Sequence, residues 1–369
     1  MSWFLTLLGI IALIILHELG HFAVAKAVGM RVERFSLFFP PTLFRIRRGE
    51  TEYAIGAIPA GGYVKITGMN PEELEGLEPE VARRAYYAQS PWKRILVILA
   101  GPGVNIVIAF LLFWAILLSG NLNGAGALQN INPAVHTLTT TTTVQSIERG
   151  AAAEGALRPG DRIVAVEGQP VTVTSIMRAV NAHRCAGALV EGCRAATPVR
   201  ITVVRSGQRV SLSIFPRYNA HEKRMLIGFL FGAAPRAFSP LTAASTALDE
   251  MWHSTTQTLT GFVNALTNSK ARHQVSSIVG ITRVGHETVA AGSGYALVFL
   301  GYLSLILAVI NLFPFLPLDG GHIAWAVAEK VRGRRVSLMA MYRYSSVGII
   351  LLLFLVINGV SNDINRLTG

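Results

Sequence analysis

Four long apolar stretches dominate the pattern of hydrophobic and polar positions along this chain. They run approximately over residues 3–28, 95–119, 295–312 and 345–360. Each is long enough, or nearly so, to cross a hydrocarbon core of ~30 Å, which takes about 20 residues of helix. The pattern therefore predicts a polytopic α-helical membrane protein with about four transmembrane helices. We expect the first helix over residues 1–29, the second over 93–120, the third over 295–332 and the fourth over 341–361.

Residues 30–92, between the first two stretches, show a different pattern. The segment "RRGETEYAIGAIPAGGYVKITGM" places Tyr, Ile and Val in alternation around Gly-rich turns, which predicts one or two β-hairpins. Its neighbour "FSLFFPPTLF" is apolar but too short and too interrupted by proline to span a membrane. Together they predict a β-element that dips into the membrane, tolerated where it lies against protein or lines a cavity, followed by a polar loop.

Residues 121–290 form the longest segment between spans. The segment "GALRPGDRIVAVEGQPV" contains a tight turn, an alternating strand and a second turn, and the strands "VRITVVR" and "VSLSIF" follow a short helical stretch. This α+β unit, at about 140–217, resembles a PDZ domain. The run "HTLTTTTTV" before it is as consistent with a strand as with a linker. Residues 237–290 are amphipathic and mostly helical in pattern, without chemistry that we can assign.

Composition and charge support the membrane interpretation. Of 369 residues, 51% are hydrophobic and only 15% are charged, which is unlike an ordinary soluble protein. The first span could instead be a signal peptide with a cleavage site near residues 25–27. Against this alternative, no basic residue precedes the apolar run and Glu18 falls inside it. The net charge of +12 requires no nucleic acid, because anionic lipid headgroups can balance it.

Basic residues near the ends of the spans predict the orientation of the chain. They are concentrated in the loop after the first span and in the loop before the last one, so both loops should face the cytoplasm. Residues 121–290, including the PDZ-like unit, should then lie outside. The basic residues are Lys26, Arg31, Arg34, Arg83, Arg84, Lys93 and Arg94 in the first loop, and Lys330, Arg332, Arg334, Arg335 and Arg343 in the second.

The chain has two cysteines, Cys185 and Cys193, and both fall in the predicted outer segment. A pair outside the cytoplasm at this short spacing favours a disulfide, and the alternative is two small, partly buried thiols. Their spacing is not that of a zinc finger.

The stretch "ILHELGHF" places ionisable side chains inside the first span. Such groups cost roughly 2.5–3.5 kcal/mol each on insertion scales, so they usually pair, bind a metal or line a wet cavity. His17 and His21 are four residues apart and project from one helical face, where both can reach one metal ion. Glu18 can reach a water there as a general base. The alternative is a structural cluster of polar groups in a helix bundle.

Two histidines leave a catalytic zinc site one protein ligand short. Asp319, in "NLFPFLPLDGGH", is the candidate in a comparable membrane setting. Asn311, Pro314 and Pro317 interrupt the helix before it, and "DGG" permits close approach of the backbone. His322 is a rival ligand, which we interpret instead as a helix-start or interface histidine.

These segments together resemble the bacterial site-2 protease family, the intramembrane zinc metalloproteases. The resemblance covers nearly the whole chain: "HELGH", the membrane-entering β-element, "AGPGVN" at residues 100–105, a single PDZ-like unit and "NLFPFLPLDGG". It implies that Zn²⁺ is held by His17, His21 and Asp319, with Glu18 as the general base. Many relatives have their two prolines spaced P-x-P, whereas Pro314 and Pro317 are spaced P-x-x-P.

The resemblance also implies where substrates bind and what they are. Asn311, Asn105 and Gly62 are the implied substrate-binding residues. The implied substrates are single-span membrane regulators, such as anti-sigma factors, already cut outside by a site-1-type protease in regulated intramembrane proteolysis. The implied location is the bacterial inner membrane, with the PDZ unit outside. The alternatives are a scaffold whose metal site is vestigial and a protease with a soluble cytoplasmic active site, but no ligand or base is missing and "HELGH" is embedded in apolar sequence.

Overall fold

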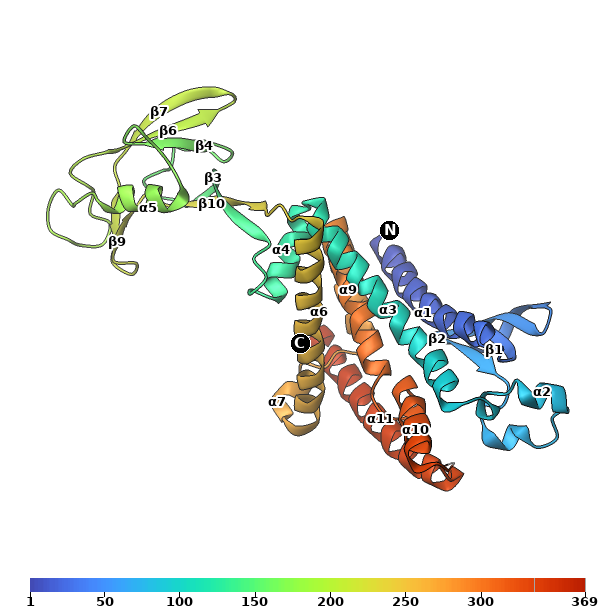
Figure 1. Cartoon of the computed structure of the whole chain (residues 1–369). Helices are drawn as coiled ribbons and strands as arrows, with labels where there is room; N and C mark the ends of the chain where they lie inside the picture. Colours follow the sequence, from blue (N-terminus) through green and yellow to red (C-terminus); the bar gives the residue numbers. More distant parts are fainter. Residues whose placement is uncertain (335, 369) are drawn as a thin grey trace. The chain divides into compact units, whose positions relative to one another are not determined.

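The computed structural model describes residues 1–334 and 336–368, so Arg335, one of the basic residues used to predict orientation, lies outside the described residues. The chain forms two compact units (Figure 1). Unit 1 comprises Met1–Val135 and Phe238–Gly369, and unit 2 comprises His136–Ala237. Each unit is described by itself below.

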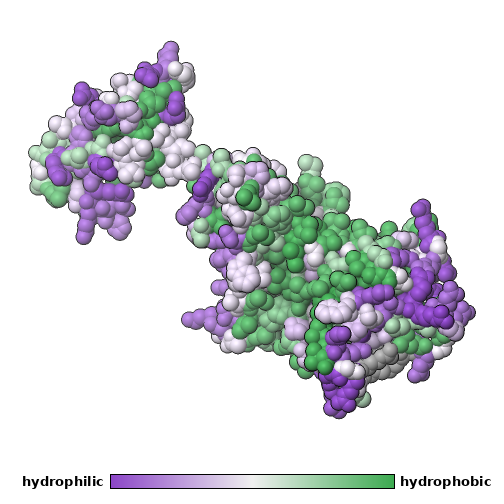
Figure 2. All heavy atoms as spheres, viewed as in Figure 1, coloured by the Kyte–Doolittle hydropathy of each residue, from purple (hydrophilic) through white to green (hydrophobic). Residues whose placement is uncertain are grey.

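Four helices among the described residues of unit 1 are long and apolar enough to cross a membrane. They are α1 (Ser2–Ala27), α3 (Pro91–Ser119), α9 (Ser293–Asn311) and residues Met339–Arg366 of α11 (Leu338–Thr368). The prediction of about four membrane helices is therefore confirmed in number, and each helix overlaps one of the predicted spans. Figure 2 shows hydrophobic residues gathered over these helices, with hydrophilic residues around α2 (Pro79–Arg83).

Helix α3 is the centre of unit 1 and contacts α1, α9, α6 (Pro240–Thr267) and α10 (Asp319–Arg332). Glycines make these contacts close. A Cβ at Gly20 of α1 would lie 2.6 Å from the carbonyl oxygen of Ala100, and one at Gly301 of α9 would lie 2.6 Å from the ring of Phe113. Small residues let apolar helices approach where lipid offers no hydrophobic driving force between them. The sequence therefore brings α1 and α9 against opposite parts of α3.

The remaining helices of unit 1 are α4 (Leu122–Ile131), α6, α7 (Ser269–Arg272) and α8 (Ile278–Ala291). The assignment of residues 237–290 to the outer segment stays a prediction. Helix α6 packs along α3 and α9 (Figure 1). The Trp114 indole donates a hydrogen bond to the carbonyl of Pro240, and the rings of Phe262 and Phe313 lie 4.3 Å apart. The other face of α6 carries exposed apolar side chains at helical spacing, namely Leu241, Leu248, Trp252, Leu259 and Val263.

The β-element of unit 1 is one long, irregular hairpin of β1 (Val32–Arg48) and β2 (Thr51–Ile66). Arg48 pairs with Thr51 across a two-residue turn. Residues 34–37 of β1 pair on one side with residues 52–55 and on the other with residues 62–65. Within the described residues, 62–66 pair only with the start of β1, so this segment is an edge. A 3₁₀ turn (Pro71–Leu74), α2 and a second 3₁₀ turn (Tyr86–Ala88) lead to α3.

Unit 2 is built around a six-stranded sheet in the order β10-β3-β4-β6-β7, with β5 beside β4. The Thr-rich run is a strand, β3, because β-branched side chains fit a sheet. The sequence analysis ended the compact unit near residue 217, whereas β10 pairs with β3 and extends the unit to Ala237. The elements are β3 (Leu138–Ile147), β4 (Arg162–Val166), β5 (Gln169–Pro170), α5 (Val173–Asn181), β6 (Val199–Arg205), β7 (Gln208–Ile214), β8 (Arg217–Asn219), β9 (Arg224–Leu226) and β10 (Phe229–Pro235).

A disulfide and an ion pair link separate segments of unit 2. Cys185 and Cys193 are joined by a disulfide, as the sequence favoured, with their Cα atoms 5.8 Å apart. The carboxylate of Asp161 accepts hydrogen bonds from the Arg205 guanidinium and from the backbone N–H of Arg158. The apolar core of unit 2 is formed by side chains of the sheet and of α5.

Candidate metal centre

Helix α1 presents two buried histidines on one face. His17 is 6% exposed and His21 is 7% exposed, and their Nε2 atoms lie 3.2 Å apart. Asp319, the first residue of α10, places its Oδ2 atom 3.2 Å from His17 Nε2 and 3.3 Å from His21 Nε2. The structure thus brings together the three side chains that the sequence selected as metal ligands.

This triangle of atoms has the dimensions of a zinc site. In a tetrahedron two ligand atoms are separated by about 1.6 times the metal–ligand distance, so zinc bonds of about 2.0–2.2 Å give separations of about 3.3–3.6 Å. The observed separations of 3.2–3.3 Å lie at the short end of that range. Imidazole nitrogen and carboxylate oxygen are also the atoms that catalytic zinc prefers.

The hydrogen bonds around the triangle support the same conclusion. His21 Nδ1 lies 2.9 Å from the carbonyl oxygen of Val97, which can only accept, so Nδ1 carries the proton, and in the neutral ring Nε2 presents a lone pair. Asp319 Oδ2 is buried and has no hydrogen-bond donor among the described residues. A lone pair and a carboxylate oxygen facing each other repel unless a cation lies between them. The donor set therefore fits a metal ion.

Close backbone approach places Asp319 beside α1. A Cβ at Gly320 would lie 2.2 Å from the carbonyl oxygen of Leu312, and one at Gly321 would lie 2.6 Å from the backbone nitrogen of Leu316. Only glycine lets the start of α10 pack against the chain that leaves α9, as the "DGG" pattern indicated. At its other end, α10 is held to α3 by a 2.6 Å ion pair between Glu329 and the buried Arg94.

The three ligand candidates open into a cavity of about 580 Å³. Glu18, Asn311 and Gly62 also line it, as does the hairpin edge near Gly62. A Cβ at Gly62 would lie 3.0 Å from Glu18 Cγ and 2.9 Å from the carbonyl oxygen of Ser36, so the edge approaches the acid closely because residue 62 is glycine. The candidate base, the candidate ligands and a free strand edge thus face one space.

Asn105 lies elsewhere than its assigned substrate-binding role suggests, whereas His322 lies where its interpretation as a non-ligand suggests. Asn105 is 0% exposed and is not among the cavity-lining residues; its amide nitrogen lies 3.5 Å from His17 Nδ1. His322 does line the cavity, but its ring lies edge-on to Tyr86, with centroids 6.3 Å apart, and it is not part of the group of three metal-ligand candidates. The preference for Asp319 over His322 therefore agrees with the geometry.

The sequence analysis did not assign a role to Gly101 of α3. A Cβ there would lie 2.2 Å from His21 Nε2, so any other residue would displace a metal-ligand candidate. The signal was present in "AGPGVN", a pair of glycines around a proline in an apolar helix, but the sequence alone does not say which glycine faces α1. The Val97 carbonyl was also missed, because a backbone acceptor leaves no sequence signal.

A charged cluster fixes the hairpin to α1. Glu50, in the turn of the hairpin, accepts hydrogen bonds from the Arg84 guanidinium at 2.7 and 2.8 Å and from Lys26 at 2.6 Å. The hydrogen bonds from Arg84, with those from Lys26, lower the pKa of the Glu50 carboxyl to about 2. This anchor holds the hairpin beside the end of α1, below the two histidines.

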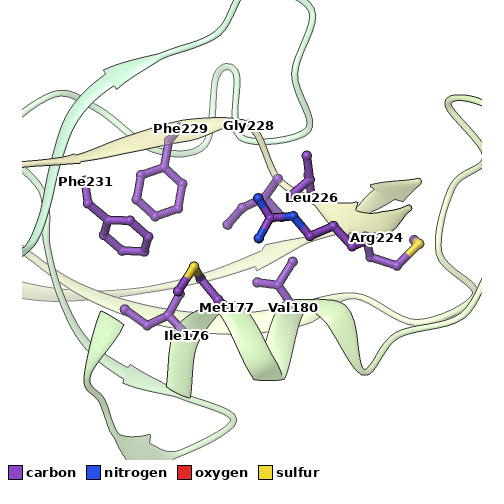
Figure 3. Close-up of a pocket in the computed structure, with 10 residues that line it drawn as sticks. Ile176, Met177, Val180, Arg224, Leu226, Gly228, Phe229 and Phe231 are labelled. Carbon is purple, nitrogen blue, oxygen red and sulfur yellow. The ribbon is translucent and has the colours of Figure 1, made fainter. Parts of the chain in front are cut away.

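Unit 2 contains a second, smaller cavity of about 170 Å³ between α5 and the β9–β10 segment (Figure 3). Its walls are mainly apolar, with one cation, Arg224, at the β9 end (Figure 3). Strand β10 pairs with β3 on one side only within the described residues, so its other edge borders this groove. The apolar lining includes Ile176, Met177, Val180, Ile227, Phe229 and Phe231.

Comparisons with known proteins agree with this site. The model of peptidase family M50 matches residues 5–355. The zinc metalloprotease Rip1 of Mycobacterium tuberculosis strain Erdman is 34% identical over 350 residues, covering 88% of this chain and 85% of Rip1. Rip1 of Mycobacterium bovis BCG has the same identity and coverage. A protein of Agrobacterium fabrum with a provisional zinc metalloprotease name is 28% identical, covering 97% of this chain and 94% of that protein. The chain belongs to peptidase family M50, the site-2 proteases, and is a zinc metallopeptidase of the membrane.

Proposed function

We propose that this chain cleaves single-span regulators, such as anti-sigma factors, inside the bacterial inner membrane after a site-1-type protease has cut them outside. The observation that carries the proposal is the cavity in unit 1. It combines a three-ligand triangle, two of whose residues lie on the apolar helix α1, with an adjacent carboxylate and a free strand edge. Soluble substrates do not need such an arrangement, because their backbone is already accessible in water.

In this proposal His17, His21 and Asp319 hold the zinc ion, and Glu18 is the general base. Zinc, when bound, polarises the scissile carbonyl and lowers the pKa of water toward about 7. Glu18 accepts the proton from the attacking water and later passes it to the leaving amine. Glu18 is suited to this role because it lines the cavity, at the hairpin edge, without being one of the three convergent ligand atoms.

The edge at residues 62–66 gives the substrate backbone new partners. A transmembrane helix satisfies its own backbone hydrogen bonds, so it must unwind before a carbonyl can be attacked. Pairing of the unwound segment with the free edge offsets the lost bonds. Gly62 lets that pairing occur beside Glu18, and Asn311 lines the same cavity and can bind the substrate backbone. The site lies roughly 21 Å along the first helix, so the product is released toward the cytoplasm.

We infer further that unit 2 is a PDZ domain outside the cytoplasm that excludes untrimmed substrates. The basic residues in the loop after the first span and in the loop before the last one support this location through the positive-inside rule. Its groove has the chemistry of a peptide site: an open strand edge for backbone pairing, an apolar floor, and Arg224 for a carboxylate. A prior cut creates a free carboxylate on any membrane-bound fragment whose C-terminal part lies outside.

The test uses purified protein in lipid vesicles with a single-span substrate in two forms, one carrying its folded outer domain and one trimmed. The intact enzyme should cut only the trimmed form, and Glu18→Gln should cut neither. Deletion of residues 136–237 should make the untrimmed form cleavable if unit 2 excludes it. Slower cleavage of both forms would show that unit 2 is a tether. A folded, zinc-loaded deletion protein that still rejects the untrimmed form would sink the exclusion role.

A further inference from the structure

Each histidine of the metal centre presents its second ring nitrogen to α3. His21 Nδ1 meets the carbonyl of Val97, as described above. His17 Nδ1 meets the side chain of Asn105, two helical turns further along α3, at 3.5 Å. A metal-binding imidazole is normally held in this way, since the proton on the other nitrogen needs an acceptor that fixes the ring.

The proton on His17 decides which atom of Asn105 must face it. When Nε2 of a neutral imidazole binds a metal, Nδ1 carries the proton and is a donor. The Asn105 amide nitrogen is also a donor, so an amide with its nitrogen toward His17 Nδ1 would set two donors against each other. The nitrogen and oxygen of an amide have nearly the same shape, and only their hydrogen bonds distinguish them. Asn105 Oδ1 is buried and has no other hydrogen-bond partner among the described residues.

We propose that Asn105 is a positioning residue whose side-chain oxygen accepts the Nδ1 proton of His17 and thereby fixes the ring for zinc. The proposal rests on the assignment of His17 as a zinc ligand. It replaces the substrate-binding role that the family resemblance implied for Asn105. A side chain that is 0% exposed and absent from the cavity wall is poorly placed to meet a substrate, whereas it contacts His17 directly.

The surroundings of Asn105 support a fixed, structural position. Its backbone carbonyl accepts a hydrogen bond of 2.9 Å from Ser304 Oγ of α9, and both residues are fully buried. This bond holds the turn of α3 that carries Asn105 between α1 and α9. Loss of an outer partner of a metal-bound histidine typically weakens metal affinity by about 10–100-fold. We expect an effect of that size when the acceptor is removed.

The test measures zinc affinity rather than proteolysis. Full-length protein in detergent, in the Glu18→Gln background to prevent self-cleavage, is titrated with zinc against a chromophoric chelator. Asn105→Leu, which keeps the volume but has no acceptor, should bind zinc about 10–100-fold more weakly. Asn105→Asp, which keeps an oxygen acceptor, should bind zinc close to the parent's affinity. Leu117→Ala, a cavity mutation in a distant part of α3, controls for loss of packing and should leave zinc affinity unchanged.

Two results would overturn the proposal. If Asn105→Leu binds zinc as tightly as the parent while raising the KM for substrate in the active protein, Asn105 contacts substrate instead. If Asn105→Asp weakens zinc as much as Asn105→Leu does, an oxygen acceptor is not what the site requires. Because the titration uses no substrate, a failure of the proposed intramembrane cleavage leaves this result independent. Should Asn105→Leu not fold, the comparison of Asn105→Asp with the parent still tests the proposal, because weaker zinc binding by the Asp variant would overturn it.

Discussion

Two aspartates, one in each unit, differ in whether the chain itself supplies a partner for their negative charge. Asp161 of unit 2 has a side chain that is 1% exposed, and its two oxygens meet the fork of Arg205 and a backbone N–H. Asp319 of unit 1 has a side chain that is 18% exposed, and its Oδ2 meets the Nε2 atoms of His17 and His21. The carboxylate of Asp161 is paired with a cation of the chain, the Arg205 guanidinium. The carboxylate of Asp319 instead faces the ring nitrogens of two histidines.

The difference separates a structural charge from a functional one. A carboxylate paired with guanidinium is complete and contributes to the stability of its unit. A carboxylate facing imidazole lone pairs is unfavourable until a cation is added, so the fold holds it in place for a ligand. Burial alone therefore does not identify a site; the hydrogen-bonding character of the neighbours does.

The largest effect is expected when the negative charge of Asp319 is removed. Asp319→Asn keeps the shape but not the charge, so zinc affinity should fall by more than the roughly 10–100-fold typical of residues that only orient a ligand, and cleavage should be abolished. His322→Ala, which lines the same cavity, is the matched control and should retain zinc. Metal analysis after dialysis against a chelator decides the ranking. Retention of zinc by the Asn variant and its loss in the Ala variant would reverse the ligand assignment.

A second change leaves the metal and removes only the base. Glu18→Gln should retain about one zinc per chain while cleavage falls by roughly 10² or more, the scale of general-base catalysis. Zinc content and single-turnover cleavage are measured on the same preparation. If zinc is lost with the activity, Glu18 is a ligand and the cluster contains four ligands instead of three.

Loss of the disulfide should affect unit 2 but not the metal centre of unit 1. Replacing Cys185 and Cys193 together by Ser should destabilise unit 2 by about 2–3 kcal/mol, on the loop-closure estimate for a short loop. Zinc affinity in unit 1 should not change. Calorimetry of the full chain with and without reductant measures the first effect, and chelator titration the second. Intact-mass analysis showing two alkylated cysteines before reduction would contradict the disulfide.

The smallest expected effect is a pH dependence of unit 2. The Arg205 guanidinium lowers the pKa of the Asp161 carboxyl, and the Arg158 N–H adds to this. Because the folded pKa is below the unfolded value of about 3.9, the pair's contribution is present above that value and is lost as the pH falls through the folded pKa. The unfolding temperature of unit 2 should therefore drop below about pH 4. Asp161→Asn should remove that part of the pH dependence, and an unaltered profile would contradict the role of the pair.

Local sequence determined the membrane helices and the pair of histidines. Apolar runs of sufficient length predict spans because lipid offers backbone groups no partners outside a helix. His17 and His21 share a face because four residues make about one helical turn. The interruption before Asp319 followed from its prolines and glycines. These are short-range properties, so they can be predicted from a few neighbouring residues; the chemical roles of the individual residues stay predictions until the mutants are measured.

Tertiary structure decided which segments that are distant along the chain contact each other. It placed α6 against α3 and α9, although the pattern of residues 237–290 indicated only an amphipathic helix. It closed the sheet of unit 2 with β10, which pairs with a strand some 90 residues earlier. It also set Gly101, the Val97 carbonyl and Asn105 of α3 against the histidines of α1. A motif such as "AGPGVN" contains two of these residues, but no period or motif says which side chains they meet, because these contacts depend on how separate helices and strands pack. The sequence thus determined which residues could bind a metal, and packing decided which others hold them in position.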